Sequence, residues 1–208
     1  MPFVSIAPAA ITEFSSIGIL YRSLFGSTLN KDEGIDAENL TQLALATLDR
    51  QMGSEPGMGL ILKKALNCIA DEFDYVLLDC PPVLGVLMVN ALAACHKVIV
   101  PVQTEFLALK GLDRMMYTLT MMSRSLNKAF DTIIVPTMFD RRTRAAIQAQ
   151  ARLMTDYSDT VWQGMIPVDT RFRDASLYHL PASVLYPKTR GVGAYQLLLK
   201  NLEAGEGS

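Results

Sequence analysis

The chain has 208 residues, half of them hydrophobic, with a formal net charge of −2 and a pI near 5.7. This length allows one domain with a sizeable core, because single cores commonly serve up to about 250 residues. The nearly balanced charge excludes a uniformly basic protein of the kind that binds nucleic acid or membrane surfaces over its whole face. Any basic patch must therefore be local.

The first residues, MPFVSIAPAAITEFSSIG, have no basic segment ahead of a long apolar run, and Glu13 and Arg22 interrupt the later candidates for a membrane span. A cytoplasmic protein without a transmembrane segment is therefore expected. The cysteines Cys68, Cys80 and Cys95 have neither a close metal-site spacing nor an even count. Each lies in apolar sequence, so we expect three buried free thiols.

Three regions are predicted along the chain. Residues 1–40 form a divergent amino-terminal segment, in which PFVSI (2–6) can supply a short strand and STLNKDEGIDAEN reads as a polar connector. Residues 41–203 are predicted to form one α/β domain, because helical periodicity alternates with runs rich in Val and Ile from about residue 57 onward. Residues 204–208 are expected to be a disordered tail.

Strands and helices alternate in the predicted domain. Runs such as YVLL and VIVPV are almost wholly apolar, which is typical of strands covered on both faces. The pattern favours a doubly wound, mostly parallel sheet with helices on both faces, and Thr143 is a candidate N-cap. The expected helices cover residues 57–70, 83–94, 109–126, 143–155 and 191–202. The expected strands cover residues 75–78, 98–102, 132–135 and 161–166.

The residues that follow each strand are the candidate site, because ligands of open parallel sheets lie beyond the carboxyl ends of the strands. They are Asp79–Pro82, Gln103–Glu105, Thr137–Asp140 and Pro167–Asp169. An acidic residue that ends an apolar strand can hold Mg²⁺ beside phosphates, usually through water. The alternative for Asp79 is a solvated aspartate that caps the next turn.

Four segments carry a family resemblance. FDYVLLDCPPVLGVLMVNALAACHKVIVPVQTEFLALKGLDRM closely resembles the Walker B strand and following segment of the ParA/MinD family of deviant P-loop ATPases. IIVPTMFDRRTRAA, IPVDTRFRDAS and YPKTRGVGAYQLLLKNL resemble later segments of that family, in the same order. The resemblance runs from about residue 41 to 203. It implies a P-loop NTPase-like fold and an ATP-dependent switch that partitions plasmids or chromosomes, or positions polar or chemotaxis arrays.

The resemblance also implies roles for particular residues. Asp79 matches the Walker B acid that holds Mg²⁺ through water, and residues 103–111 match a switch-like segment that responds to nucleotide and contributes to the dimer face. ATP and Mg are the implied cofactors. The implied partners are a second subunit, in a homodimer or heteromer, and a cargo adaptor that stimulates hydrolysis. The implied adenine-binding walls, formed largely by main-chain contacts, are Thr137, Met138, Pro167, Val168 and Asp169.

One defining part of the family is absent from the sequence. No K-G-G-x-G-K-[ST] loop occurs, and the nearest candidate is FGSTLN, residues 25–30. The family's aspartate-rich motif after its second strand is also missing. We therefore expect impaired ATP hydrolysis, because phosphoryl transfer depends on positioning and charge stabilisation by these parts. A truncated chain, a degenerate paralogue and a rebuilt amino terminus remain open, and the first two are favoured.

Other functions compete with a nucleotide switch. A non-catalytic interaction module of the same fold is the main alternative. A bacterial tyrosine-kinase domain ranks last, because LEAGEGS carries no tyrosine cluster. Arg141, Arg142 and Arg144 form either a solvated turn or a nucleotide or partner contact. Nonspecific DNA binding has weak support from three cations near the carboxyl terminus, Lys188, Arg190 and Lys200.

Overall fold

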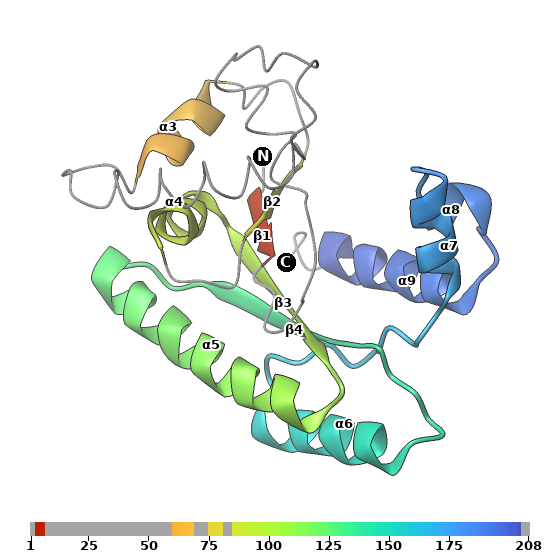
Figure 1. Ribbon diagram of the computed structural model, residues 1–208. Helices are drawn as coiled ribbons and strands as arrows, with labels where there is room; N and C mark the ends of the chain where they lie inside the picture. Colours follow the sequence, from red (N-terminus) through yellow and green to blue (C-terminus); the bar gives the residue numbers. More distant parts are fainter. Residues whose placement is uncertain (1–2, 7–59, 69–74, 81–84, 205–208) are drawn as a thin grey trace, which may run out of the picture. The chain divides into compact units, whose positions relative to one another are not determined.

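The computed structural model describes residues 3–6, 60–68, 75–80 and 85–204 (Figure 1). The chain divides into two compact units. The first contains Met1–Ile99 and Met116–Thr132, and the second contains Val100–Met115 and Ile133–Ser208. Each unit is described by itself, although three elements have residues in both of them: strand β3 (Lys97–Gln103), helix α5 (Phe106–Leu126) and strand β4 (Asp131–Thr137).

The sheet of the first unit has the strand order β2-β1-β3. Strand β1 (Phe3–Ile6) pairs in parallel with β2 (Val76–Asp79) and with the first residues of β3. Phe3–Ile6 of the segment PFVSI therefore form a strand, and this strand lies between the two apolar runs recognised in the sequence. In the register of this sheet, Ile6 is opposite both Asp79 and Ile99.

The described helices of the first unit are α3 (Ile61–Asn67), α4 (Val86–Ala94) and the carboxyl-terminal part of α5. Helix α4 is apolar on nearly every face, and its buried Asn90 has a structural role. The Asn90 Oδ1 accepts a hydrogen bond from Leu62 N at 3.1 Å, and its Nδ2 donates to Val86 O at 2.9 Å. Asn90 thus satisfies a free amide in the first turn of α3, whose own N-cap residue makes no side-chain cap.

In the second unit β3 lies next to β4 (Asp131–Thr137). The helices that follow are α6 (Arg144–Asp156), α7 (Arg171–Leu177), α8 (Ala182–Leu185) and α9 (Arg190–Ala204). Thr143 is the N-cap of α6, as predicted, because its Oγ1 accepts a hydrogen bond from Ala146 N at 3.3 Å. Helices and a parallel sheet confirm the predicted α/β class. The short helices α7 and α8 were not predicted.

The predicted strand over residues 161–166 is wrong. The segment begins to pair with β4, since Trp162 N donates to Ile134 O at 2.8 Å. The next donor on β4 would be Pro136, which has no N–H and cannot continue the ladder. Pro136 O instead accepts a hydrogen bond from Ile166 N at 2.8 Å, so the residues between bulge out of the ladder.

Only isolated bridges remain of that strand, at Ile134 with Val161 and at Phe139 with Pro167. The register shifts by one residue between the two bridges. The indole of Trp162 folds back over the bulge, where a Cβ on Gly164 would lie 2.4 Å from Trp162 Cζ2.

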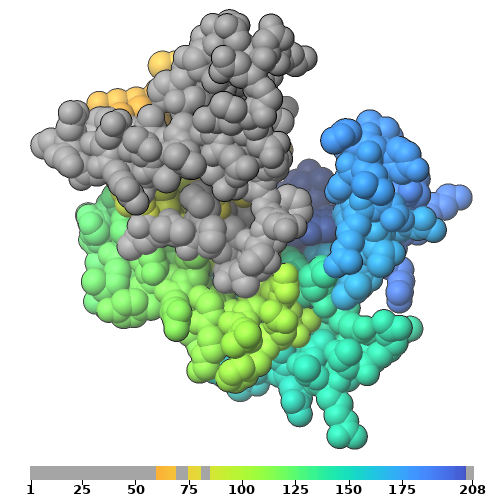
Figure 2. All heavy atoms as spheres, viewed as in Figure 1, coloured from red at the N-terminus to blue at the C-terminus, as the bar shows by residue number. Residues whose placement is uncertain are grey.

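Helices α7, α8 and α9 share a small apolar cluster of Ala175, Ala182 and Val192. Phe172, Leu185 and Tyr186 pack against this cluster. Atoms of α7 and α8 lie at the surface of the second unit (Figure 2). The exposed large apolar side chains of this segment are Leu177, Tyr178, Leu180 and Val184.

No helix in the described part of the chain is both long and apolar enough to cross a membrane.

The expectation of three buried thiols is confirmed for Cys80 and Cys95 and wrong for Cys68, which is exposed. Cys68 is the C-cap of α3 and follows Leu66, the buried residue of this helix, by two positions. Burial raises the pKa of the Cys95 thiol to about 11.

The folded protein should therefore react with a thiol reagent at Cys68 alone, because the thiolate is the reactive form and the reagent needs access. We expect one cysteine to be labelled rapidly by a maleimide or disulfide reagent at pH 8, and the other two only after unfolding in guanidinium. Peptide mapping by mass spectrometry identifies the labelled residue, and Cys68→Ser is the control. Rapid native labelling of Cys95 would contradict its burial.

Candidate functional site

Asp79 is the last residue of β2. Its side chain is exposed, whereas its neighbours Leu78 and Cys80 are buried. The alternation of a strand explains this arrangement, because successive side chains point to opposite faces. In the first unit, the Asp79 carboxylate therefore stands at the carboxyl end of the sheet, in register with Ile6 of β1.

The other predicted site residues belong to the second unit, at the end of β4. Phe139 N donates to Ile166 O and Val168 N donates to Phe139 O, both at 3.1 Å. These bonds hold the segment after Thr137 beside the segment that contains Pro167. The structure thus brings together the two stretches that the sequence assigned to the adenine walls.

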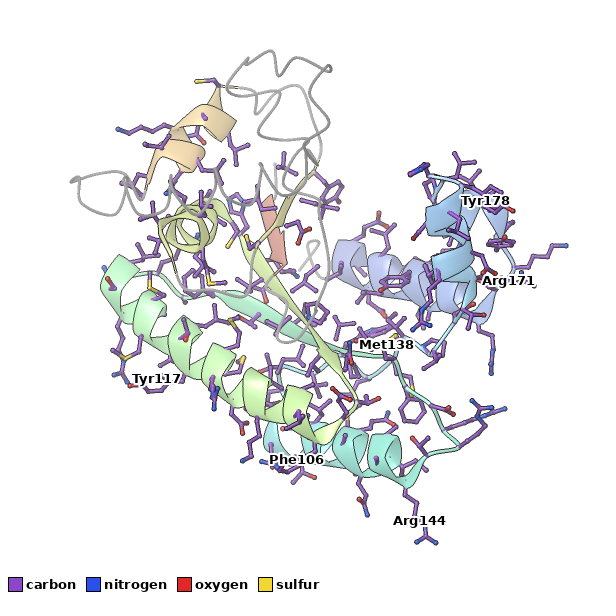
Figure 3. The ribbon with its side chains drawn as sticks, viewed as in Figure 1. Phe106, Tyr117, Met138, Arg144, Arg171 and Tyr178 are labelled. Atoms are coloured by element: carbon purple, nitrogen blue, oxygen red, sulfur yellow. The ribbon has the colours of Figure 1, made fainter. Side chains whose placement is uncertain are left out.

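Two exposed apolar side chains lie on these paired stretches. Met138 is 43% exposed and Val168 is 39% exposed. Met138 (Figure 3) has a φ of 53°, in the left-handed region that a residue with a side chain seldom adopts. Such strain is concentrated at sites where the surrounding structure holds the backbone in place. Exposed apolar side chains on two adjoining stretches are the kind of surface that can contact an apolar ligand face.

The Asp169 side chain connects two helices of the second unit. Its Oδ1 accepts a hydrogen bond from Arg171 N at 3.1 Å, and its Oδ2 accepts one from Gly191 N at 3.0 Å. Burial works to raise the pKa of the carboxyl, but hydrogen bonds from Gly191, Arg171 and Thr189 outweigh it and lower the pKa. The side chain therefore caps the starts of α7 and α9 and is engaged within the protein.

The arginine-rich turn before α6 is largely solvated. Arg142 makes a two-pronged hydrogen bond with Asp140, at 2.9 Å from Nε to Oδ1 and 2.7 Å from Nη2 to Oδ2. These bonds lower the pKa of Asp140 to about 2. Arg141 and Arg144 are exposed, and Arg144 extends away from the ribbon in Figure 3.

Sequence reasoning placed Thr104 among the residues that follow a strand and within the switch-like segment, but gave it no individual role. In the structure its side chain is buried and bonded to the end of β4. The sequence offered one signal for this contact, namely a small hydroxyl residue that lies between an apolar strand and the start of a helix.

A single carboxylate is compatible with a magnesium ion beside a nucleotide. Among the described residues, no group of three or more His, Cys, Asp or Glu side chains could hold a metal ion. Magnesium in nucleotide sites is commonly bound by one or two carboxylates, with water and phosphate oxygens as the other ligands. The structure does not describe the part of the site that would bind the phosphates, because the nearest loop candidate, residues 25–30, lies outside the described part of the chain.

Comparison with known proteins gives related sequences. The profile of a family described as an AAA domain matches residues 32–132. The sporulation initiation inhibitor protein Soj of Bacillus subtilis is 36% identical over 146 residues, which are 69% of this chain and 57% of that protein. The chromosome-partitioning ATPase Soj of Treponema pallidum is 34% identical over 158 residues, which are 76% of this chain and 62% of that protein. The matches thus span about three fifths of these relatives.

A solved structure shows the same fold. Cobyrinic acid a,c-diamide synthase of Mycobacterium smegmatis, with bound ADP and magnesium, superimposes with a TM-score of 0.66. The match covers 98% of this chain and 84% of that one, at 23% identity. The fold is therefore that of the P-loop NTPases. With the Soj relatives, it confirms the resemblance found in the sequence: the chain belongs to the ParA/MinD-type family of P-loop ATPases.

Proposed function

We propose that this chain is a ParA-like protein that helps to partition or position a cellular cargo and uses bound MgATP as the signal. The observation that carries the proposal is the pairing of Phe139 with residues 166–168, which places the exposed side chains of Met138 and Val168 on adjoining stretches at the end of β4. The Soj relatives, one of them a chromosome-partitioning ATPase, support the cargo role.

In this proposal each strand end has its own task. Asp79 would hold Mg²⁺ through water, and bound magnesium would neutralise charge on the phosphates. Met138 and Val168 would cover the faces of the adenine, while main-chain groups of Thr137, Pro167 and Asp169 would contact its edge. A second subunit and a partner that stimulates hydrolysis would complete the switch, in the cytoplasm.

A non-catalytic interaction module of the same fold is the second candidate. It is favoured by one observation, the absence of K-G-G-x-G-K-[ST] from the sequence. Main-chain amides of that loop supply most phosphate contacts in P-loop proteins. A chain that binds nucleotide weakly can still use the fold as a surface for partner proteins.

Isothermal titration calorimetry with MgATP separates the two candidates. We expect micromolar binding by the 208-residue chain, and a Kd at least about tenfold higher for Asp79→Asn, which corresponds to about 1.4 kcal/mol. The loss should appear only with Mg²⁺ present, because the carboxylate acts on the metal. Asp159→Asn, at an exposed aspartate outside the site, is the matched control and should bind like the unaltered chain.

The outcomes have distinct meanings. A complete lack of MgATP binding would contradict the nucleotide switch and favour the interaction module. Equal binding by the unaltered chain and by Asp79→Asn would show that Asp79 does not act on the metal. Light scattering with and without MgATP then tests the proposed second subunit, since a nucleotide-dependent switch should change the molar mass in solution.

A further inference from the structure

Thr104 links the end of β3 to the end of β4 within the second unit. Its side chain is only 5% exposed. The Thr104 N–H donates to Thr137 O at 3.1 Å, and its Oγ1 lies 3.3 Å from Thr137 O and 3.4 Å from Met138 O. The one hydroxyl proton is therefore directed at two carbonyls of neighbouring peptides, both in the stretch proposed to contact the base.

Thr104 is itself held firmly on the side of α5. Glu105 N donates to Gln103 O at 2.8 Å, which closes a tight turn around Thr104. Leu109 N donates to Glu105 O at 3.2 Å, so the first turn of α5 follows directly. Thr104, whose hydroxyl reaches β4, is thus the second residue of the switch-like segment, residues 103–111.

At the other end of the link the backbone is strained. The φ of 53° at Met138 costs about 1 kcal/mol or more for a residue with a side chain. A partly buried carbonyl also loses some free energy when it has no hydrogen-bond donor. The Thr104 hydroxyl supplies a donor at the Met138 carbonyl, and so favours the orientation of the peptide that follows this strained residue.

We propose that Thr104 is a positioning residue, which holds the Thr137–Met138 turn in the conformation that receives the base and ties this turn to the switch-like segment. The role of Thr104 in base recognition rests on the proposed nucleotide site. The hydrogen bonds that join Thr104 to Thr137 and Met138 belong to the nucleotide-free chain. Thr104 touches no nucleotide in this proposal. Its effect on base recognition passes through Met138.

Hydrogen exchange of the nucleotide-free chain tests the link. Thr104→Val keeps the shape and the backbone N–H but removes the hydroxyl, whereas Thr104→Ser keeps the hydroxyl. We expect amides of residues 137–140 to exchange about tenfold faster in the valine variant, which corresponds to about 1.4 kcal/mol of local opening. The serine variant should exchange at close to the original rate.

Thr120→Val is the matched control. The Thr120 hydroxyl also donates to a main-chain carbonyl, that of Met116 at 2.9 Å, but within α5. Its removal should leave exchange at residues 137–140 unchanged. Equal exchange at these residues in Thr104→Val and the original chain would overturn the link. So would a serine variant that behaves like the valine variant.

A binding measurement tests the use of the link. The affinities of each variant for ATP and GTP are compared, because both carry the same phosphates. Thr104→Val should lose about fivefold or more of the preference for ATP while its affinity for GTP changes little, and Thr104→Ser should restore the preference. An unchanged ratio in the valine variant would overturn the role in base recognition. If the original chain binds neither ATP nor GTP, the proposed function and the role of Thr104 in base recognition are both contradicted. The hydrogen-exchange result would still decide whether Thr104 holds the Thr137–Met138 turn.

Discussion

Gly191→Ala is expected to lower the free energy of unfolding by about 2–3 kcal/mol, because an added methyl group would overpack a closed site. A Cβ at this position would lie 2.3 Å from Phe172 Cε2 and 2.9 Å from both Cβ and Oδ2 of Asp169. Phe172 packs on the small core of α7, α8 and α9 and stacks edge to face with Tyr195, at 5.6 Å between ring centroids. The neighbours therefore have little room to move.

The same substitution two residues later should have the opposite sign. Gly193 also lies in α9, and a Cβ there would meet nothing within 4 Å. Gly193→Ala should raise the free energy of unfolding by about 0.5–1 kcal/mol, because alanine loses less backbone entropy than glycine in a helix. The two variants add the same atoms to the same helix, so they separate packing from helix propensity.

Urea denaturation followed by circular dichroism gives both free energies. A neutral or stabilising Gly191→Ala would show that Phe172 and Asp169 can move aside, which would contradict the packing described for this corner. The displaced Asp169 would also disturb Val168 beside it. Gly191→Ala should therefore weaken nucleotide binding as well, whereas Gly193→Ala should leave it unchanged.

Lys128→Met is expected to lower the free energy of unfolding by about 2–3 kcal/mol, because hydrogen bonds to a charged group are strong and buried carbonyls are costly to leave unpaired. In the first unit the Lys128 ammonium donates to the carbonyls at the end of α4. Its Nζ lies 3.1 Å from Leu92 O and 3.4 Å from Ala93 O, and it also bonds to Cys95 O. A cation at this end of a helix is further stabilised by the helix dipole.

The end of α5 places this lysine. Asn127 adopts a left-handed conformation with a φ of 47°, and Lys128 N donates back to Ser123 O at 3.0 Å. This arrangement is a common way to end a helix, and it leads the chain toward α4. Burial lowers the pKa of Lys128, and the neighbouring Cys95 works against that shift.

Thermal and urea unfolding of three variants test the role of Lys128. Lys128→Arg keeps a cation on a longer head group and should lose less stability than Lys128→Met. Lys64→Met, at an exposed lysine of α3, is the matched control and should change the free energy by no more than about 0.5 kcal/mol. If Lys128→Met were as mild as Lys64→Met, the hydrogen bonds at the end of α4 would contribute little.

Much of the fold could be predicted from the sequence. The strands at β2, β3 and β4 and the helices at α4, α5, α6 and α9 lie within a few residues of their predicted ranges. Apolar runs and helical periodicity identify such elements because burial acts on every residue of a long segment. Helices α7 and α8 have only seven and four residues, too few to show a period.

The candidate site could be predicted in part. The rule that ligands lie at strand ends pointed to Asp79 and to the two stretches at residues 137–140 and 167–169, and the structure pairs these two stretches. Their roles remain proposals. The contacts of Thr104 could not be predicted, because its two acceptors lie more than thirty residues away in the sequence. The expected domain limits at residues 40 and 203 stay predictions.

By itself the sequence determined the α/β class, the family and the strand ends, since these follow from apolar patterning and from ordered motifs carried by single segments. The tertiary structure alone decided where neighbouring segments constrain one another. Pro136 of β4 has no N–H, so the segment over residues 161–166 finds no hydrogen-bond donor at that point. The pairing between the two segments therefore ends there. Gly191 and Thr104 show the same dependence, since the atoms that limit them belong to distant parts of the chain.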